Sequence, residues 1–265
     1  MPTALTINAS DSGGGTGVQA DLKTFAAFGV YGTCAVTAVS AQNTLGVSAV
    51  QPLAADLVTA QIEAVAEDFS LDAVKTGLLP SAAIVEAVAA AIEALELPFV
   101  VVDPVMVSRT GAPLVEEDAV TAIRAELLPR AYVVTPNIPE AAALSGIAIT
   151  SSDSAREAAR RIHGLGASAV VVKGGRRRGA SLVDLLFDGH DFFEIEAPWV
   201  EARATQGTGA AFAAAVVASL ARGLALQGAV HEAQDYVQGA LRHGMPLGRG
   251  EGSLDHFWKV TGRLA

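Results

Sequence analysis

The chain alternates short, continuously apolar runs with segments in which apolar residues recur every three to five positions. The apolar runs are rich in β-branched residues and lack strict alternation with polar ones, so they predict strands buried on both faces of a parallel sheet. They cover residues 5–9, 33–39, 72–79, 99–105, 131–137 and 169–175. The segments between them, such as residues 18–29 and 57–69, predict amphipathic helices. Repeated βαβ units are therefore expected.

The pattern changes after Gly175. Residues 181–198 read as two strands joined at Asp188-Gly189, a dipeptide that favours a hairpin turn, so one edge of the sheet is expected to be antiparallel. After Pro198 the pattern predicts helix to the end of the chain. No linker, low-complexity tract or long repeat divides the sequence, and residues 1–265 are expected to form a single α/β domain.

The composition excludes several classes of partner. The 265 residues include 28 acidic and 18 basic ones, and the net charge of -10 argues against nucleic acid or an acidic membrane, because phosphate groups select basic faces. A small-molecule ligand is expected instead. Cys34 is the only cysteine, which leaves no disulfide framework and no cysteine metal cluster. The sequence shows neither a secretory signal nor a membrane-spanning run, and a cytoplasmic location is expected.

Four glycines occupy residues 13–17, between a predicted strand and a predicted helix. A dinucleotide-binding fingerprint needs a third glycine where Val18 stands and an acid about 20 residues further on, but no Asp or Glu occurs between Asp21 and Asp56. A P-loop would need a lysine that is missing here. Asp11 and Asp21 flank the loop and favour a polar, uncharged ligand with donor groups. A tight turn without a ligand is the alternative.

A second glycine motif precedes a long alanine-rich segment with a helical pattern. Gly207, Thr208 and Gly209 stand at its start, where free amides and the positive end of the helix dipole converge. This arrangement predicts an anion-binding site. A helix cap formed by Thr208 and packed on small residues is the alternative.

Polar side chains follow three of the predicted strands. Asp103 ends one strand, and Lys173 ends another. Asn137 and Glu140 follow a strand that lies between these two in the sequence. Ligands of open α/β sheets bind at the carboxyl ends of the strands, so acids for Mg²⁺, a lysine for phosphate charge and the anion site are expected to face one crevice. Together these groups are typical of a site for phosphoryl transfer. Taken one at a time, each residue could instead be a helix cap or a surface charge.

The motifs occur in a recognisable order. The chain contains, in succession, SDSGGGTGVQADLKTF, TAVSAQNTLGV, DAVKTGLL, VVDPVMVSRTGAPL, LLPRAYVVTPNIPEAAALSG, VVVKGG and QGTG. This series, from about residue 4 to residue 225, resembles the hydroxymethylpyrimidine and phosphomethylpyrimidine kinases of thiamine biosynthesis, in the ribokinase-like superfamily. The first motif together with AQNT is specific to this family and its pyridoxal-kinase relatives.

The resemblance implies a three-layer ribokinase-like fold, with a central, mostly parallel sheet flanked by helices, and a homodimer. It also implies two ATP- and Mg²⁺-dependent steps. The first phosphorylates 4-amino-5-hydroxymethyl-2-methylpyrimidine, and the second converts that monophosphate to the diphosphate. A pyridoxal kinase, or a non-catalytic pyrimidine- or nucleotide-binding paralogue, is the alternative.

The resemblance also assigns roles to residues, with the glycine loop placed against the pyrimidine. The substrate ring is expected to lie against Asp21, Gln42, Leu78 and Val105. Mg²⁺ is expected at Asp103 and Glu140. ATP is expected to contact Asp103, Asn137, Glu140, Lys173 and Thr208. The transferred phosphoryl group is expected to lie against Gly207, Thr208, Gly209 and Lys173.

Several positions depart from the family pattern. Ala210 stands where the family usually has a cysteine proposed as the base, and alanine cannot accept a proton. Gln206 replaces a usual histidine, Leu78 replaces a usual methionine, and Ala9 adds a methyl group beside the glycine loop. The monophosphate step is therefore expected to be better retained than the alcohol step.

Two further loops are expected beside the crevice. Residues 109–111 are expected to form a flap over it. The three arginines at 176–178 are expected to form a solvated loop, with contact between one arginine and an ATP phosphate as the alternative.

Overall fold

The computed structural model describes residues 1–107, 113–174 and 181–261. The expected flap at residues 109–111 and the arginines at 176–178 lie outside these ranges. Within them, no helix is long and apolar enough to cross a membrane.

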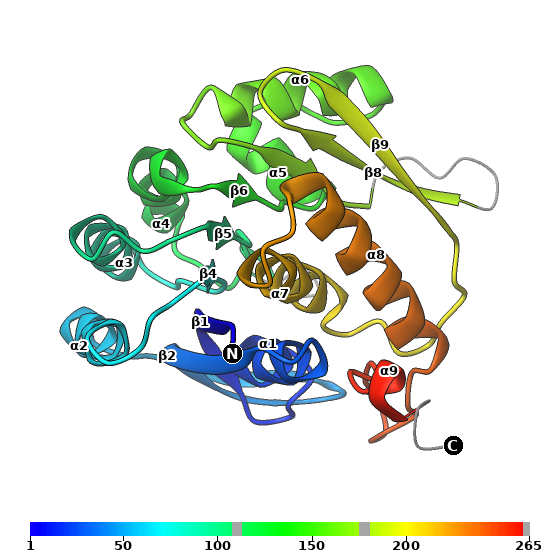
Figure 1. Ribbon diagram of the computed structural model, residues 1–265, viewed down its shortest axis with the longest axis horizontal. Coiled ribbons are helices and arrows are strands. Elements are labelled where there is room, and N and C mark those ends of the chain that lie inside the picture. Colours follow the sequence, from blue (N-terminus) through cyan, green and yellow to red (C-terminus); the bar gives the residue numbers. More distant parts are fainter. Residues whose placement is uncertain (108–112, 175–180, 262–265) are drawn as a thin grey trace.

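A single sheet runs through the described part of the chain and contains nine strands in the order β3-β2-β1-β4-β5-β6-β7-β8-β9 (Figure 1). Strands β2, β1, β4, β5, β6 and β7 are parallel, while β3 pairs antiparallel with β2, and β8 pairs antiparallel with β7 and β9. The bounds are β1 Thr3–Asp11, β2 Tyr31–Asn43, β3 Gly46–Pro52, β4 Ala73–Thr76, β5 Val100–Val102, β6 Val133–Val134, β7 Val170–Val172, β8 Ser181–Phe187 and β9 Phe192–Pro198.

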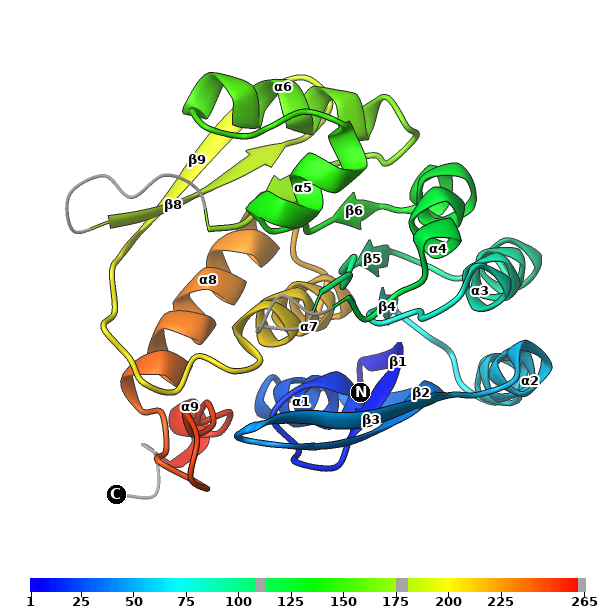
Figure 2. The ribbon, with the colours of Figure 1, turned by 180° about the vertical axis from the view of Figure 1, so that it is seen from behind.

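Helices cover both faces of the sheet. In Figure 1 the strands β1 to β6 lie between α2, α3 and α4 on one side and α1 and α7 on the other, and Figure 2 shows the same layers from behind. The helices are α1 Gly17–Ala27, α2 Ala55–Ala66, α3 Ala82–Ala94, α4 Glu117–Ala122, α5 Ile138–Ser145, α6 Ser152–His163, α7 Thr208–Ala221, α8 Leu226–Arg242 and α9 Trp258–Thr261. A π-helical turn, Ile123–Leu127, and a 3-10 turn, Leu128–Arg130, follow α4.

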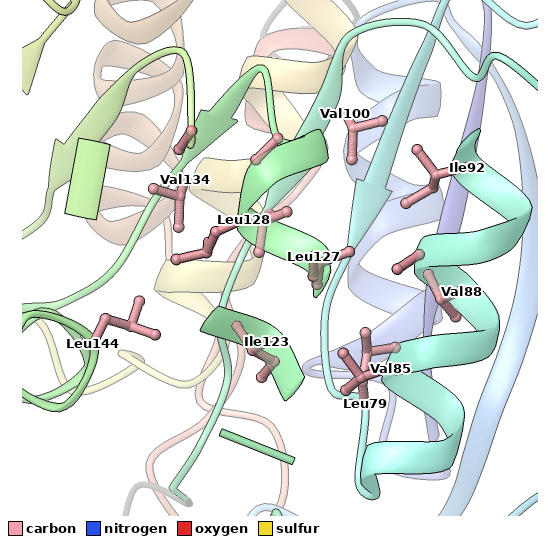
Figure 3. Close-up of a cluster of buried hydrophobic side chains, with 14 of the residues drawn as sticks. Leu79, Val85, Val88, Ile92, Val100, Ile123, Leu127, Leu128, Val134 and Leu144 are labelled. Carbon is pink, nitrogen blue, oxygen red and sulfur yellow. The ribbon is translucent and has the colours of Figure 1, made fainter. Parts of the chain in front are cut away.

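The core explains why the strand sequences are apolar without alternation. Val100 and Val102 of β5 belong to the cluster that packs on α2 to α6, part of which is shown in Figure 3. Val101, between them, belongs to the opposite cluster with α1, α7 and α8. Both faces of each central strand are therefore removed from water, as expected for a parallel sheet covered on both sides. Residues 211–220 of α7 are all buried, and the alanines among them belong to the second cluster.

The structure confirms the predicted α/β fold, the three layers and the hairpin of β8 and β9. The edge strand β3 was not predicted, and it makes the other edge of the sheet antiparallel as well. The prediction of helix to the end of the chain was wrong for residues 243–257, which form an irregular loop closed by a bridge between Met245 and Ser253. A single domain stays a prediction, which the continuous sheet supports.

Candidate active site

A cavity of about 710 Å³ opens at the carboxyl ends of the parallel strands. Its walls come from the ends of β1 and β2, from β3 and β8, from the segments after β4, β5, β6 and β7, from the start of α7, and from one face of α8. The expected site residues that line it are Gln42, Leu78, Asp103, Val105, Asn137, Glu140, Lys173, Gly207, Thr208, Gly209 and Ala210. The fold therefore brings these residues together from six separate segments of sequence, and of the expected set only Asp21 lies outside the lining.

The glycine loop is held from within by Asp11. Its Oδ1 accepts from the amide of Gly13 at 2.7 Å, and its Oδ2 accepts from the amides of Gly15 at 3.0 Å and Thr16 at 2.8 Å. Gly17 has a φ of +61°, and a Cβ there would lie 2.2 Å from the carbonyl oxygen of Ala9. The interpretation that Asp11 serves ligand donors is therefore corrected, because the loop's own amides use its oxygens.

Asp21 lies beneath the cavity and is fully buried. Its Oδ2 accepts from Thr6 Oγ1 at 2.6 Å, Asn8 Nδ2 at 2.9 Å and Lys75 Nζ at 3.0 Å. Burial raises the pKa of the Asp21 carboxyl, and the Lys75 ammonium opposes that rise. Asp21 is therefore separated from the cavity space by the residues it holds, which is a correction to the expectation that it faces the ring.

Asn8 links Asp21 to the cavity wall through hydrogen bonds. Its Oδ1 accepts from the backbone amides of Ala9 and Leu78, each at 2.8 Å. These two residues and Ala38 form a small buried apolar cluster, against which Val105 packs. The wall formed by Leu78 and Val105 is thus apolar and fixed by a buried polar network.

Gln42 lies at the end of β2 beside this apolar wall. Its Nε2 is 3.4 Å from Thr16 Oγ1, and its Oε1 is 3.4 Å from Ser40 Oγ. Both distances exceed the usual range for strong hydrogen bonds. The carboxamide therefore retains capacity to donate to and accept from a polar ring edge.

The two glycine motifs, far apart in sequence, touch each other. Gly207 has a φ of +83°, and a Cβ added to it would lie 2.0 Å from the carbonyl oxygen of Gly15. A Cβ at Gly15 would lie 3.3 Å from the side chain of Gln206. The loop expected to hold the ring and the loop expected to hold the anion therefore form one continuous floor.

The start of α7 carries the features of an anion site. Gly207 is the N-cap residue and no side chain caps the helix, because the Thr208 hydroxyl donates to the carbonyl oxygen of Thr205 at 2.6 Å. The alternative of a helix cap by Thr208 is therefore not observed. Lys173 faces the same point, since a Cβ added at Gly209 would lie 3.3 Å from its Nζ. Amide dipoles and an ammonium converge there.

Lys173 and Asp103 form a buried ion pair, with 2.7 Å between Nζ and Oδ1. Burial alone would lower the pKa of Lys173, but the carboxylates of Asp103 and Glu140 outweigh it, so the pKa is raised and the ammonium stays charged. Asp103 Oδ1 is also 3.4 Å from Thr135 Oγ1, and its Oδ2 lies 3.9 Å from Lys75 Nζ.

Asn137 and Glu140 form the capping box of α5. Asn137 Oδ1 accepts from the Glu140 amide at 2.9 Å, and Glu140 Oε2 accepts from the Asn137 amide at 2.8 Å. Their spacing of three is thus explained by the helix start, while both residues also line the cavity. Burial raises the pKa of Glu140 to about 7; Lys173 opposes the rise and the neighbouring Asp103 adds to it.

The far end of the cavity lies beyond Lys173 and was not predicted from the sequence. Asp184 of β8 lines it, accepts from the Gly174 amide at 2.7 Å, and accepts from Gln234 Nε2 at 3.2 Å. Burial raises the pKa of Asp184 to about 6. Phe212 and Leu241 add apolar surface, so this end of the cavity combines buried polar groups with apolar side chains. The signal that could have shown it is a pair of buried amides, Gln234 and Gln238, on the apolar face of α8.

The sequence and the fold both match known proteins. Residues 11–255 match the family described as phosphomethylpyrimidine kinase. The chain is 45% identical over 255 residues to the hydroxymethylpyrimidine/phosphomethylpyrimidine kinase of Bacillus subtilis, covering 96% of this chain and 94% of that protein.

Two solved structures superimpose on the whole chain. An ADP complex of Bacillus subtilis pyridoxal kinase has a TM-score of 0.90 and 38% identity, with 100% of both chains covered. The pyridoxal kinase of Staphylococcus aureus in complex with AMP-PCP and pyridoxal has a TM-score of 0.88 and 35% identity, with 98% of this chain and 95% of that chain covered. The family match and the identity over nearly the whole length agree with the cavity geometry: the chain belongs to the phosphomethylpyrimidine kinase family and is a phosphotransferase.

Proposed function

We propose that the protein uses ATP and Mg²⁺ to phosphorylate 4-amino-5-hydroxymethyl-2-methylpyrimidine and its monophosphate, and that it performs the second step better than the first. One observation carries the proposal: a single cavity joins an apolar wall that carries an amide, at Leu78, Val105 and Gln42, to an anion site at Lys173 and the start of α7. When the pyrimidine ring of the acceptor lies against this wall, its hydroxymethyl or phosphomethyl substituent can reach the anion site.

The amide of Gln42 suits an aminopyrimidine edge, because it offers one donor group and one acceptor. The apolar side chains of Leu78 and Val105 suit the ring face and the methyl substituent. The identity to the Bacillus subtilis pyrimidine kinase, 45%, exceeds the 38% identity to its pyridoxal kinase, which favours the pyrimidine as the acceptor.

Asp103 and Glu140 fit a magnesium site. Both carboxyls line the cavity; burial raises the pKa of Glu140, and repulsion from the Asp103 carboxylate adds to that rise. A divalent cation relieves that repulsion, and Mg²⁺ is commonly held by one or two carboxylates together with substrate phosphates. A bound Mg²⁺ would neutralise part of the charge on the phosphate groups.

The chain's own groups then act on the transferred phosphoryl. The acceptor oxygen forms a bond to the γ-phosphorus while the bond from that phosphorus to the β,γ-bridging oxygen of ATP breaks, and ADP leaves. The monophosphate attacks through an oxygen that is already deprotonated, whereas the alcohol must give its proton to solvent or to a phosphate oxygen. The amides at Gly209 and Ala210 and the ammonium of Lys173 stabilise the charge on the equatorial oxygens. The floor formed by Gly15 and Gly207 keeps acceptor and donor at a fixed separation.

Assays of the purified protein with ATP, Mg²⁺ and each acceptor test the proposal. Conversion of the pyrimidine monophosphate to the diphosphate, faster than conversion of the alcohol, is expected. Phosphorylation of pyridoxal in preference to either pyrimidine would make the protein a pyridoxal kinase, the second candidate that the two superimposed structures favour. Binding of a pyrimidine or a nucleotide with no turnover would make it a non-catalytic paralogue.

Replacing Gln42 with leucine is expected to weaken pyrimidine binding by about 1–3 kcal/mol, because a buried ring amine or nitrogen would lose its partner. The affinity for ADP should stay unchanged, since Gln42 is on β2 and Asp184 on β8, six places away in the order of the strands. Calorimetric titration with each ligand measures both affinities. An equal loss for both ligands would show that Gln42 supports the structure of the site instead.

We also infer a homodimer and a cytoplasmic location. Apolar side chains are exposed on the hairpin of β2 and the edge strand β3, including Val39, Leu45 and Val47, of which Leu45 and Val47 also line the mouth of the cavity. An apolar edge of this kind is typical of a surface buried between subunits. Sedimentation is expected to give twice the mass of one chain, and Val47→Lys should shift the protein to monomers; a monomeric native protein would contradict the dimer.

A further inference from the structure

Lys75 is a fully buried lysine on β4 that the mechanism above does not use. A buried lysine is rare unless its charge is paired. Its Nζ donates to Asp21 Oδ2 at 3.0 Å and lies 3.9 Å from Asp103 Oδ2. It therefore stands between the carboxyl beneath the ring wall and the carboxyl expected to hold the metal.

The hydrogen bonds and ion pairs on the two sides of Lys75 lead to two different parts of the cavity, the ring wall and the anion site. On one side, Asp21 accepts from Asn8, whose Oδ1 holds the amides of Ala9 and Leu78 in the ring wall. On the other side, Asp103 accepts from Lys173, whose ammonium faces the start of α7. Charges of opposite sign alternate along the series Asp21, Lys75, Asp103, Lys173.

The two lysines make different contacts with Asp103. Lys173 forms a hydrogen bond to Oδ1 at 2.7 Å. Lys75 lies too far from Oδ2 for a hydrogen bond, yet the attraction between two buried charges at 3.9 Å is strong because little water screens it. Lys75 thus fixes the direction of the carboxylate while leaving Oδ2 able to bind a cation in the cavity.

We propose that Lys75 is a positioning residue for phosphoryl transfer, acting through Asp103, whose orientation it sets for the metal. This inference rests on the proposed kinase function and on the fit of Asp103 to Mg²⁺. Groups that orient a metal ligand from behind typically change metal affinity or activity by about 10–100-fold when removed. The structural alternative is that Lys75 only neutralises Asp21.

A pair of variants separates these two roles. Asp21→Asn keeps an oxygen for Thr6, Asn8 and Lys75, and it leaves Lys75 facing Asp103. Adding Lys75→Met to Asp21→Asn removes the ammonium without leaving Asp21 charged and unpaired. Comparison of the double variant with Asp21→Asn therefore isolates the effect of Lys75 on Asp103. Lys75→Gln in the same background keeps a polar partner for residue 21 and replaces the methionine variant if that one does not fold.

Two measurements are made on folded protein, with thermal unfolding as the check. One is kcat and the Mg²⁺ concentration for half-maximal rate with the pyrimidine monophosphate. The other is the calorimetric affinity for ADP with and without Mg²⁺, which does not depend on turnover. The double variant is expected to need about tenfold more Mg²⁺ than Asp21→Asn and to lose most of the gain in ADP affinity that Mg²⁺ gives, with little change in KM for the pyrimidine.

Equal Mg²⁺ dependence in the double variant and in Asp21→Asn, by both measurements, would overturn the proposal and leave Lys75 as a partner of Asp21 alone. A rise in the pyrimidine KM with unchanged Mg²⁺ dependence would overturn it as well. Failure of the kinase proposal looks different, because the native protein itself would then show no phosphorylation of either pyrimidine.

Discussion

Lys173→Ala is expected to lower kcat with the pyrimidine monophosphate by roughly a hundredfold, about 3 kcal/mol of transition-state stabilisation. The reason is the position of the ammonium, which faces Gly209 at the start of α7 and is kept charged by Asp103 and Glu140. Without it, the charge that develops on the transferred phosphoryl group is met by the helix amides and the metal alone. Steady-state rates at saturating ATP and Mg²⁺ measure the effect.

The variant also removes one partner of a buried ion pair, since Lys173 Nζ lies 2.7 Å from Asp103 Oδ1. Loss of one partner of such a pair commonly destabilises the fold by about 3–5 kcal/mol, so denaturant unfolding must show that the variant is folded under the assay conditions. Lys259→Ala is the matched control, because Lys259 lies in α9 and does not line the cavity. Full activity in folded Lys173→Ala would remove Lys173 from the mechanism.

The strand-end residues were predictable because the geometry of a parallel sheet is regular. Asp103, Asn137 and Lys173 each follow an apolar run, and parallel strands bring their carboxyl ends to one edge. A correct alternation of strands and helices was therefore enough to place these side chains in one cavity. The identity of the ligand did not follow from this placement and came from the order of the motifs.

The buried network under the site was not predictable from local sequence. Lys75 lies 54 residues from Asp21, and Lys173 lies 70 residues from Asp103. No spacing rule connects residues so far apart, and a lysine within an apolar run looks the same whether it reaches water or a buried carboxylate. The family resemblance assigned Asp21 to the ring, but its place in α1 directs the carboxyl to Thr6 and Lys75 beneath the cavity instead.

Some local patterns had two valid explanations at once. The spacing of Asn137 and Glu140 is that of a capping box, and the structure shows the capping box and the cavity lining together. Likewise Asp11 combines loop support with a place on the cavity wall. For such residues the sequence pattern indicates that the side chain has a role. Only the contacts in the structure show whether that role is to support the fold, to line the cavity, or both.

Ala210→Cys is expected to raise phosphorylation of the hydroxymethylpyrimidine by about 10²–10⁴-fold, the usual contribution of a positioned base, and to leave the monophosphate reaction nearly unchanged. Ala210 lies in the first turn of α7 and lines the cavity. A thiol in the first turn of a helix has its pKa lowered, because the helix dipole stabilises the thiolate, and the Lys173 ammonium faces the neighbouring Gly209. Such a thiolate can accept the proton that the attacking alcohol must lose.

The pyrimidine monophosphate, the acceptor of the second step, does not need a base at position 210. The second ionisation of a phosphate monoester lies near pH 6, so at neutral pH its attacking oxygen is already largely deprotonated. Positioning and charge stabilisation by Lys173 and the α7 amides are then expected to suffice. Rates for both acceptors in the native protein and in Ala210→Cys measure the selectivity, with Ala210→Ser as a control of similar size whose hydroxyl is a far weaker base. The prediction is contradicted if the native protein phosphorylates the alcohol as fast as the monophosphate and Ala210→Cys changes neither rate. The proton of the alcohol would then leave to solvent or to a phosphate oxygen, and the residue at position 210 would not determine which of the two steps is faster.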